Sequence, residues 1–150
     1  MSKIYRRAEK LLYSFPVNLM RMRETVQSLR DLRQQSDCHA QRYEQSFSSE
    51  GTHSDPVAAY NAKLAHLEEQ LVRQYSAICP VMAVRSVIKN SSNERYREMF
   101  YIMELFYFEH MTLTDVAIHL QKSVSTLSRR RQELTGLVIN EMQTIRDIIH

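Results

Sequence analysis

The sequence predicts an all-α protein, and its composition is the first reason. The 150 residues include only two glycines and three prolines, whereas a β-rich fold uses such residues in its many turns. Apolar residues also recur at spacings of three and four over long stretches, which is the period of an amphipathic helix. With 43% hydrophobic and 25% charged residues, the chain has the composition of a folded domain rather than a disordered one.

The first half of the chain is expected to form two long helices. The segment 4–15 is weakly amphipathic and ends before Pro16, which we expect to break it. A longer helical stripe begins at Leu19 and is expected to continue past Tyr43. The segment SFSSEGTHSDP (46–56) is rich in turn-forming residues and is predicted to be a loop.

A second stripe of apolar residues over 57–78 has the spacing of a coiled-coil seam. Asp55 can cap its helix, with Pro56 at the favoured first position, and Pro80 is expected to kink or interrupt it. Together the two stripes predict a helical hairpin over residues 1–90. Such an arm could serve dimerisation or contact with RNA polymerase.

The NSSN segment at 90–93 is the next break and predicts a domain boundary, with a C-terminal domain over residues 91–150. Ser91 and Glu94 have the spacing of a capping box. They are expected to open a helix that is apolar nearly all round, and such a helix belongs at the centre of a small core.

Two further helices are expected to complete this domain. Thr112 and Asp115 repeat the capping spacing and open a short helix, and Ser123 can cap a longer one. Two helices joined by a three- or four-residue turn, the second basic at its start, are typical of a helix-turn-helix. The apolar positions expected to pack this motif are Val116, Ala117, Leu120, Leu127 and Leu134.

The second of these helices carries three consecutive arginines, Arg129, Arg130 and Arg131. Successive helical residues point about 100° apart, so the three cannot share one face. The face opposite Leu127 and Leu134 is expected to read base edges in the major groove, with Arg129 as the candidate partner for guanine. The base-reading candidates are Ser125, Ser128, Arg129 and Gln132. The phosphate-binding candidates are Lys122, Ser123, Thr126, Arg130 and Arg131. A solvated face whose arginines pair with Glu133 and Glu141 is the alternative for the triplet taken alone.

The segment YFEHMTLTDVAIHLQKSVSTLSRRRQEL (107–134) resembles the helix-turn-helix of sigma-factor region 4. More closely, it resembles that of the phage regulators called RinA and ArpU. The resemblance implies activation of late phage transcription, including packaging genes, by binding a promoter and recruiting RNA polymerase. Gln121 and Lys122 stand where the family usually has glycine and then an aliphatic residue. We expect the missing glycine to cost about 1 kcal/mol if φ is positive there.

The expected partner is double-stranded DNA, with RNA polymerase and a second copy of the chain as further candidates. From Gln121 to Gln132 there are four basic residues and no acidic one, which is typical of polyanion binding. We expect no enzyme, cofactor or metal, because no phosphate loop, nucleophile elbow or metal-ligand spacing is present. No apolar stretch approaches the roughly 18 residues that span a membrane, and a cytoplasmic location in a bacterial host cell is expected.

Two other functions fit the same sequence. A small terminase subunit also combines a helix-turn-helix with oligomerising helices, and would use DNA for packaging. A coiled-coil adaptor would use the helical arm and would not read DNA specifically.

Overall fold

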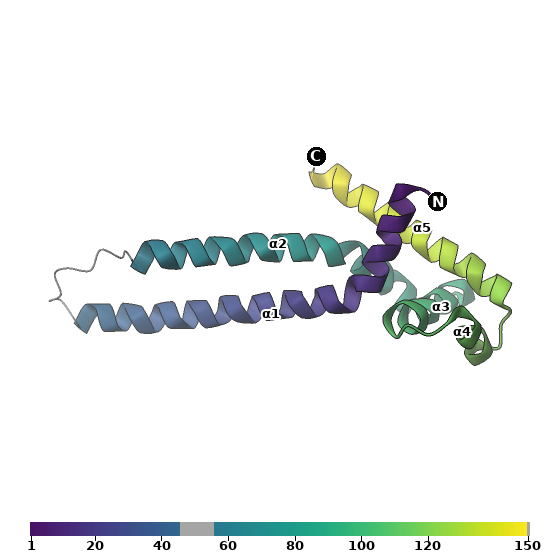
Figure 1. Ribbon diagram of the computed structural model, residues 1–150, viewed down its shortest axis with the longest axis horizontal. Helices are drawn as coiled ribbons and strands as arrows, with labels where there is room; N and C mark the ends of the chain where they lie inside the picture. The colour runs from purple at the N-terminus through teal and green to yellow at the C-terminus, as the bar shows by residue number, and fades with distance from the viewer. Residues whose placement is uncertain (46–55, 150) are drawn as a thin grey trace. The chain divides into compact units, whose positions relative to one another are not determined.

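The structure is a computed structural model that describes residues 1–45 and 56–149, without the side chains of 36–45 and 149. The all-α prediction is confirmed, since every described element is helical and the described ranges contain no strand. Asp55 and the predicted loop up to that residue lie outside these ranges. The elements are α1 (Lys3–Gln45), α2 (Pro56–Lys89), α3 (Glu94–Tyr101), the π-helix η1 (Ile102–Phe108), α4 (Leu113–Leu120) and α5 (Val124–Ile149) (Figure 1).

Both long helices run through their internal prolines. The predicted break at Pro16 is wrong, and α2 is not interrupted at Pro80. A proline inside a helix costs roughly 3 kcal/mol. The side chains beside these prolines are fully buried, including Leu12, Ile78 and Val81. Burying each such side chain contributes about 1.5–3 kcal/mol, which is enough to hold the helical path through the proline.

The chain divides into two compact units. Residues 1–18 and 76–150 form the first, here called the core unit, and residues 19–75 form the second, here called the hairpin unit. This division differs from the boundary expected at 90–93, because both ends of the predicted arm belong to the core unit. The physical reason is burial: Ala8 from α1 and Ile88 from α2 are fully enclosed there.

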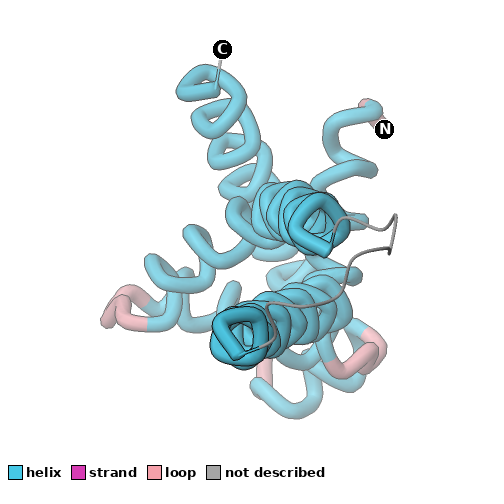
Figure 2. The backbone as a smooth tube through the Cα atoms, turned by 90° about the vertical axis from the view of Figure 1, so that its left-hand side faces the viewer, coloured by secondary structure: helices cyan, strands magenta, loops and turns pink. Residues whose placement is uncertain are grey.

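In its described residues, the hairpin unit consists of two helical segments that run alongside each other in opposite directions (Figures 1 and 2). Thr25 and Leu29 of α1 are buried, while Leu64 and Leu67 of α2 are half-buried. A pair of helices can cover only one side of each apolar stripe, which accounts for this partial burial.

The interior of the core unit collects apolar side chains from every helix that enters it. The fully buried side chains include Tyr107, Leu12, Ile78, Ile88, Ile102, Met103, Leu127, Leu134, Val81, Val116 and Val138. Three of these belong to α5, three to η1 and three to α2, so these three elements supply most of the fully buried interior.

The helix that was expected to open at Glu94 has two kinds of helical winding in the structure. Asn93, rather than Ser91, caps its start: the Asn93 side-chain oxygen accepts a hydrogen bond from the Arg95 N–H at 2.9 Å. The first two turns are α-helical, and the rest is the π-helix η1. The chain leaves η1 through His110, which has a left-handed φ of 59°.

Candidate nucleic-acid interface

The helices α4 and α5 and the turn between them occupy the segment for which the sequence predicts a helix-turn-helix, and this segment is called the motif below. The Thr112 hydroxyl accepts a hydrogen bond from the Asp115 N–H at 3.1 Å, and the Ser123 hydroxyl accepts one from the Thr126 N–H at 3.2 Å. Both residues therefore cap the helices that the sequence predicted for them. Residues 121–123 make the turn.

The turn depends on a left-handed residue at Gln121, where φ is 56°. Its N–H donates to the Ile118 carbonyl at 3.3 Å, and the Lys122 N–H donates to the Ala117 carbonyl at 3.0 Å. This pair of bonds is the usual way to end a helix and is most often made with glycine. The positive φ that makes a non-glycine residue costly is therefore present, and Gln121 carries the strain.

The motif is packed by the apolar positions that its pattern indicates. Val116, Leu127 and Leu134 are fully buried, Ala117 is buried and Leu120 is half-buried. Their burial fixes the side of α5 that faces the interior, and thereby the side that faces solvent.

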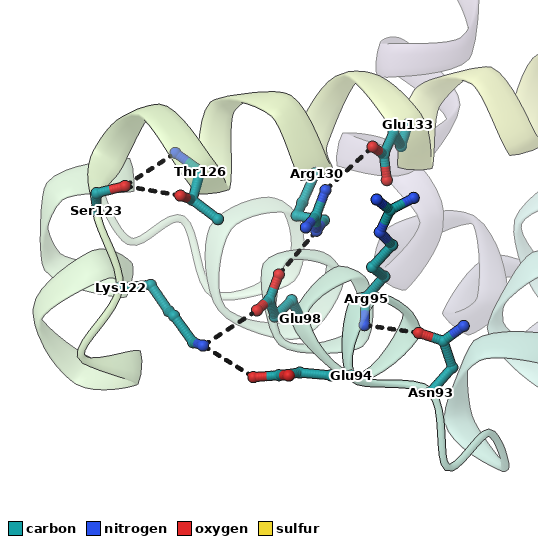
Figure 3. A network of polar contacts seen from close by, with 9 residues as sticks. All are labelled: Asn93, Glu94, Arg95, Glu98, Lys122, Ser123, Thr126, Arg130 and Glu133. Atoms are coloured by element: carbon teal, nitrogen blue, oxygen red, sulfur yellow. Dashed lines mark hydrogen bonds and ion pairs between the residues drawn. The ribbon is translucent and has the colours of Figure 1, made fainter.

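Arg130 points toward the interior side of α5 (Figure 3). Its Nε donates to Glu98 Oε2 at 2.8 Å and its Nη1 donates to Glu133 Oε1 at 3.1 Å. The Arg130 side chain is 13% exposed and the Glu98 side chain 10%. This pair therefore joins α5 to α3 in a largely buried setting.

Arg131 lies in a second polar cluster. Its Nη2 and Nε donate to Glu9 Oε1 at 2.5 and 3.1 Å, and its Nε also lies 3.1 Å from the Tyr107 hydroxyl. That hydroxyl donates to Glu9 at 3.0 Å. The guanidinium also stands 4.6 Å from the centre of the Phe106 ring, within cation–π range. These contacts tie α5 to η1 and to the first turns of α1.

Burial and hydrogen bonding set the protonation of this cluster. Burial of the Tyr107 hydroxyl raises its pKa well above the usual value near 10. Burial alone would lower the pKa of Arg131, but its hydrogen bonds to Tyr107 and Glu9 outweigh that effect and the pKa is raised. Tyr107 is thus neutral and Arg131 charged across the whole physiological range.

Lys122, in the turn, is also paired. Its Nζ lies 2.8 Å from Glu94 Oε1 and 3.5 Å from Glu98 Oε1 (Figure 3). The hydrogen bond from Lys122 lowers the pKa of the Glu94 carboxyl, and the same bond raises the pKa of Lys122. Glu94 is 75% exposed, so this pair is open to water and contributes little to stability.

These contacts change the interpretation of the predicted phosphate-binding residues. Lys122, Arg130 and Arg131 already bond carboxylates of the core unit, so fewer of their N–H groups and less of their charge are available to a phosphate. Ser123 and Thr126 bond each other through their hydroxyls at 2.7 Å, in the cap of α5. The pairing of Arg130 with Glu133, three residues later, belongs to the alternative that the sequence offers for the arginine run. The partners Glu9, Glu94 and Glu98 were not foreseen because they lie far away in sequence, Glu9 being 122 residues from Arg131.

The predicted base-reading face is more exposed to solvent than the predicted phosphate-binding arginines. Ser125, Arg129 and Gln132 are exposed, and Ser128 is half-buried. Within the described ranges, Arg129 forms no ion pair, unlike Lys122 and the other two arginines. The three side chains Ser125, Arg129 and Gln132 lie within about one side of α5, given 100° per residue. This face can therefore offer hydrogen bonds to an external partner.

Comparison of the chain with protein-family models, curated proteins and solved structures finds no match. Across the described part of the chain, no helix is long and apolar enough to cross a membrane. The same part contains no group of three His, Cys, Asp or Glu side chains that could hold a metal ion.

Proposed function

We propose that the core unit binds double-stranded DNA, with α5 in the major groove. Arg129 would contact guanine through both guanidinium N–H groups, and Gln132 and Ser125 would contact neighbouring base edges. The observation that carries this proposal is the position of Arg129: it follows a capped three-residue turn, faces outward, and has no carboxylate partner among the described residues.

The electrostatics of the motif favour sequence reading over general attraction to DNA. Lys122, Arg130 and Arg131 already neutralise carboxylates of the core unit. Near the turn, Arg129 is then the arginine without an ion pair among the described residues, and a single such cation gains little from counterion release, which dominates non-specific binding. The affinity of the motif would then depend on the correct bases being present.

The biological role we propose is transcriptional regulation, by analogy with the RinA and ArpU type of phage regulator that the motif resembles. In this role the protein activates late phage genes, with RNA polymerase as a partner. The packaging alternative draws on the hairpin unit, whose half-buried Leu64 and Leu67 would suit an oligomer. A solution mass measurement separates the two, because a small terminase subunit forms a ring and a promoter-binding regulator does not require one.

The test of DNA reading is selection of bound duplexes from a random pool at about 150 mM salt, where non-specific binding is already weakened. The proposal predicts one enriched motif, containing a guanine whose replacement lowers affinity. A pool that stays random, with a protein of unchanged helicity, would contradict it and favour the adaptor function.

A further inference from the structure

The first turns of α1 carry a row of basic residues on one side. These residues follow the spacing i, i+3, i+4 and i+7, which aligns side chains along one helix face. All four are exposed, whereas Ala8, Leu12 and Phe15 on the opposite side are buried in the core unit. This row, here called the basic stripe, consists of Lys3, Arg6, Arg7 and Lys10.

The basic stripe has no internal counter-charge. Among the described residues, none of its four side chains forms an ion pair. Glu9 is the acidic residue of this segment, and its carboxylate bonds Arg131 and Tyr107 instead. The local acid therefore holds the segment to α5 and leaves the stripe positive.

This arrangement works against the stability of α1. Like charges at spacings of three and four repel each other along a helix. The positive end of the helix dipole lies at the N-terminus, and the first turn contains no acidic residue to offset it. An anion outside the chain would relieve both effects, so the charge pattern points to an external polyanion rather than to a structural role.

The stripe is fixed to the unit that carries α5. The Tyr13 ring lies 4.8 Å from the Tyr107 ring and the Phe15 ring 5.1 Å from the Phe108 ring, centre to centre. With the Glu9–Arg131 bonds, these contacts hold the first turns of α1 across α5 (Figure 1). The stripe points away from these contacts, since it lies on the face opposite the buried residues.

We propose that the basic stripe is a second DNA-binding surface that contacts phosphates, separate from the base-reading face of α5. Arg and Lys side chains along a helix are suited to phosphate oxygens. The apolar side of this segment is enclosed by the core unit, so it cannot insert into a lipid surface as amphipathic membrane helices do. The choice of DNA as the nucleic acid rests on the proposed function. The phosphates would come from the flank of the same duplex or from a second duplex.

The experiment compares two triple variants of the full chain that each remove the same amount of charge. The stripe variant carries Arg6→Gln, Arg7→Gln and Lys10→Gln. The control carries Arg21→Gln, Arg23→Gln and Arg30→Gln, which are exposed positions in the hairpin unit. Affinity for a selected duplex and for an unrelated duplex is measured as a function of salt concentration.

The proposal predicts that the stripe variant flattens the slope of log K against log salt by up to about 0.9 for each phosphate that it no longer binds. At about 0.1 M salt this corresponds to an affinity lower by roughly eightfold per phosphate, equal for both duplexes. The unfolding midpoint should stay the same or rise, because repulsion is removed. The control should retain the slope and affinity of the wild type.

Equal decreases in affinity for the two triple variants would overturn the proposal, because overall charge would then explain them. Unchanged DNA binding by the stripe variant would overturn it too, and the proposed function would stand if Arg129→Ala still lost discrimination. If the stripe variant flattens the salt slope while Arg129→Ala still discriminates between the two duplexes as the wild type does, the result would support the basic stripe and refute the proposed function. Vesicles of anionic phospholipid test the lipid alternative, since loss of vesicle binding with unchanged DNA binding would assign the stripe to membranes.

The two sources of phosphate are separated with duplexes of two lengths. A flank contact predicts that extending the duplex beyond the selected motif raises the affinity of the wild type and not of the stripe variant. A second-duplex contact predicts that the wild type binds two short duplexes and the stripe variant one. A wild type that shows neither effect would contradict a second surface.

Discussion

Arg129 and Arg131 stand two residues apart on α5 and have opposite surroundings. Arg131 is bonded to Glu9 and Tyr107 and covers the Phe106 ring, whereas Arg129 is exposed on the other side of the helix. The difference shows that a run of arginines is not a single charged feature. Because successive residues point about 100° apart, each arginine of the run faces a different environment.

The inward arginines also fix that rotation. Arg130 and Arg131 bond carboxylates on α3, α5 and α1. Turning α5 by one residue would break the bonds to Glu98 and Glu9, which lie on other helices, and leave those carboxylates with unpaired charge in a partly buried site, which is costly. The network therefore determines that Arg129 and Gln132 face outward.

The largest expected effect comes from Arg131→Ala. It removes charge-assisted hydrogen bonds to Glu9, each worth about 1.5–3 kcal/mol. The Glu9 carboxylate, 14% exposed in the wild type, keeps one hydrogen bond from Tyr107. We expect the free energy of unfolding, measured by urea denaturation, to fall by about 2–3 kcal/mol. Arg129→Ala is the matched control and should change stability by less than about 0.5 kcal/mol. An equal fall in the two variants would refute the difference between them.

Alkaline pH should weaken the same cluster. A tyrosine in the unfolded chain ionises near pH 10, but burial raises the pKa of folded Tyr107 and keeps its proton bound. Above about pH 10 the folded state therefore holds more protons, and stability should fall by up to about 1.4 kcal/mol per pH unit. Below about pH 10 Tyr107 is protonated in both states, so its ionisation takes nothing from stability there.

The check is urea denaturation of the wild type and of Tyr107→Phe at several pH values from about 9 to 11. The variant should lose most of the alkaline slope. A smaller slope should remain, because burial also raises the pKa of Tyr13. A slope that is the same in both proteins would exclude Tyr107 as its source.

Gln121→Gly should stabilise the motif. The residue has a φ of 56°, which glycine adopts without the clash of a Cβ atom, so we expect a gain of up to about 1 kcal/mol in unfolding free energy. Base discrimination should not change, since α5 keeps its inward contacts. A decrease in stability would show that the Gln121 side chain makes a contribution larger than the strain.

Gly136→Ala should give a similar or smaller gain. Gly136 follows Arg129 by seven residues and thus lies on the same side of α5, and an added Cβ would meet nothing within 4 Å. Alanine in a helix interior is favoured over glycine by about 0.5–1 kcal/mol. Thermal unfolding measures the gain. If the variant is more stable but binds the selected duplex more weakly, DNA approaches α5 as far as this residue.

The sequence predicted the local features of the motif well, since they depend on neighbouring residues. The caps at Thr112 and Ser123 and the buried positions Leu127 and Leu134 follow from spacing alone. Spacing also predicted that Arg129 faces a different side of the helix from Arg130 and Arg131, because a helix has a fixed rotation per residue.

The features that depend on distant residues could not be predicted in this way. Nothing near Arg131 indicates that Glu9 binds it, and the π-helical winding of η1 has no local signal that we recognise. The break at Pro16 was wrong because local rules count the missing hydrogen bond and not the burial around it. Burial of side chains from both ends of the predicted arm is also the reason that these ends belong to the core unit.

The most direct test of the difference between the arginines pairs protein variants with base-pair substitutions in the selected duplex. Affinities of the wild type, Arg129→Ala and Arg131→Gln are measured for the selected duplex and for duplexes that each carry one changed base pair. We predict that discrimination at one base pair falls by about 1–3 kcal/mol in Arg129→Ala, while Arg131→Gln, measured where it is folded, keeps the discrimination of the wild type. Reduced discrimination in Arg131→Gln with full discrimination in Arg129→Ala would contradict this prediction.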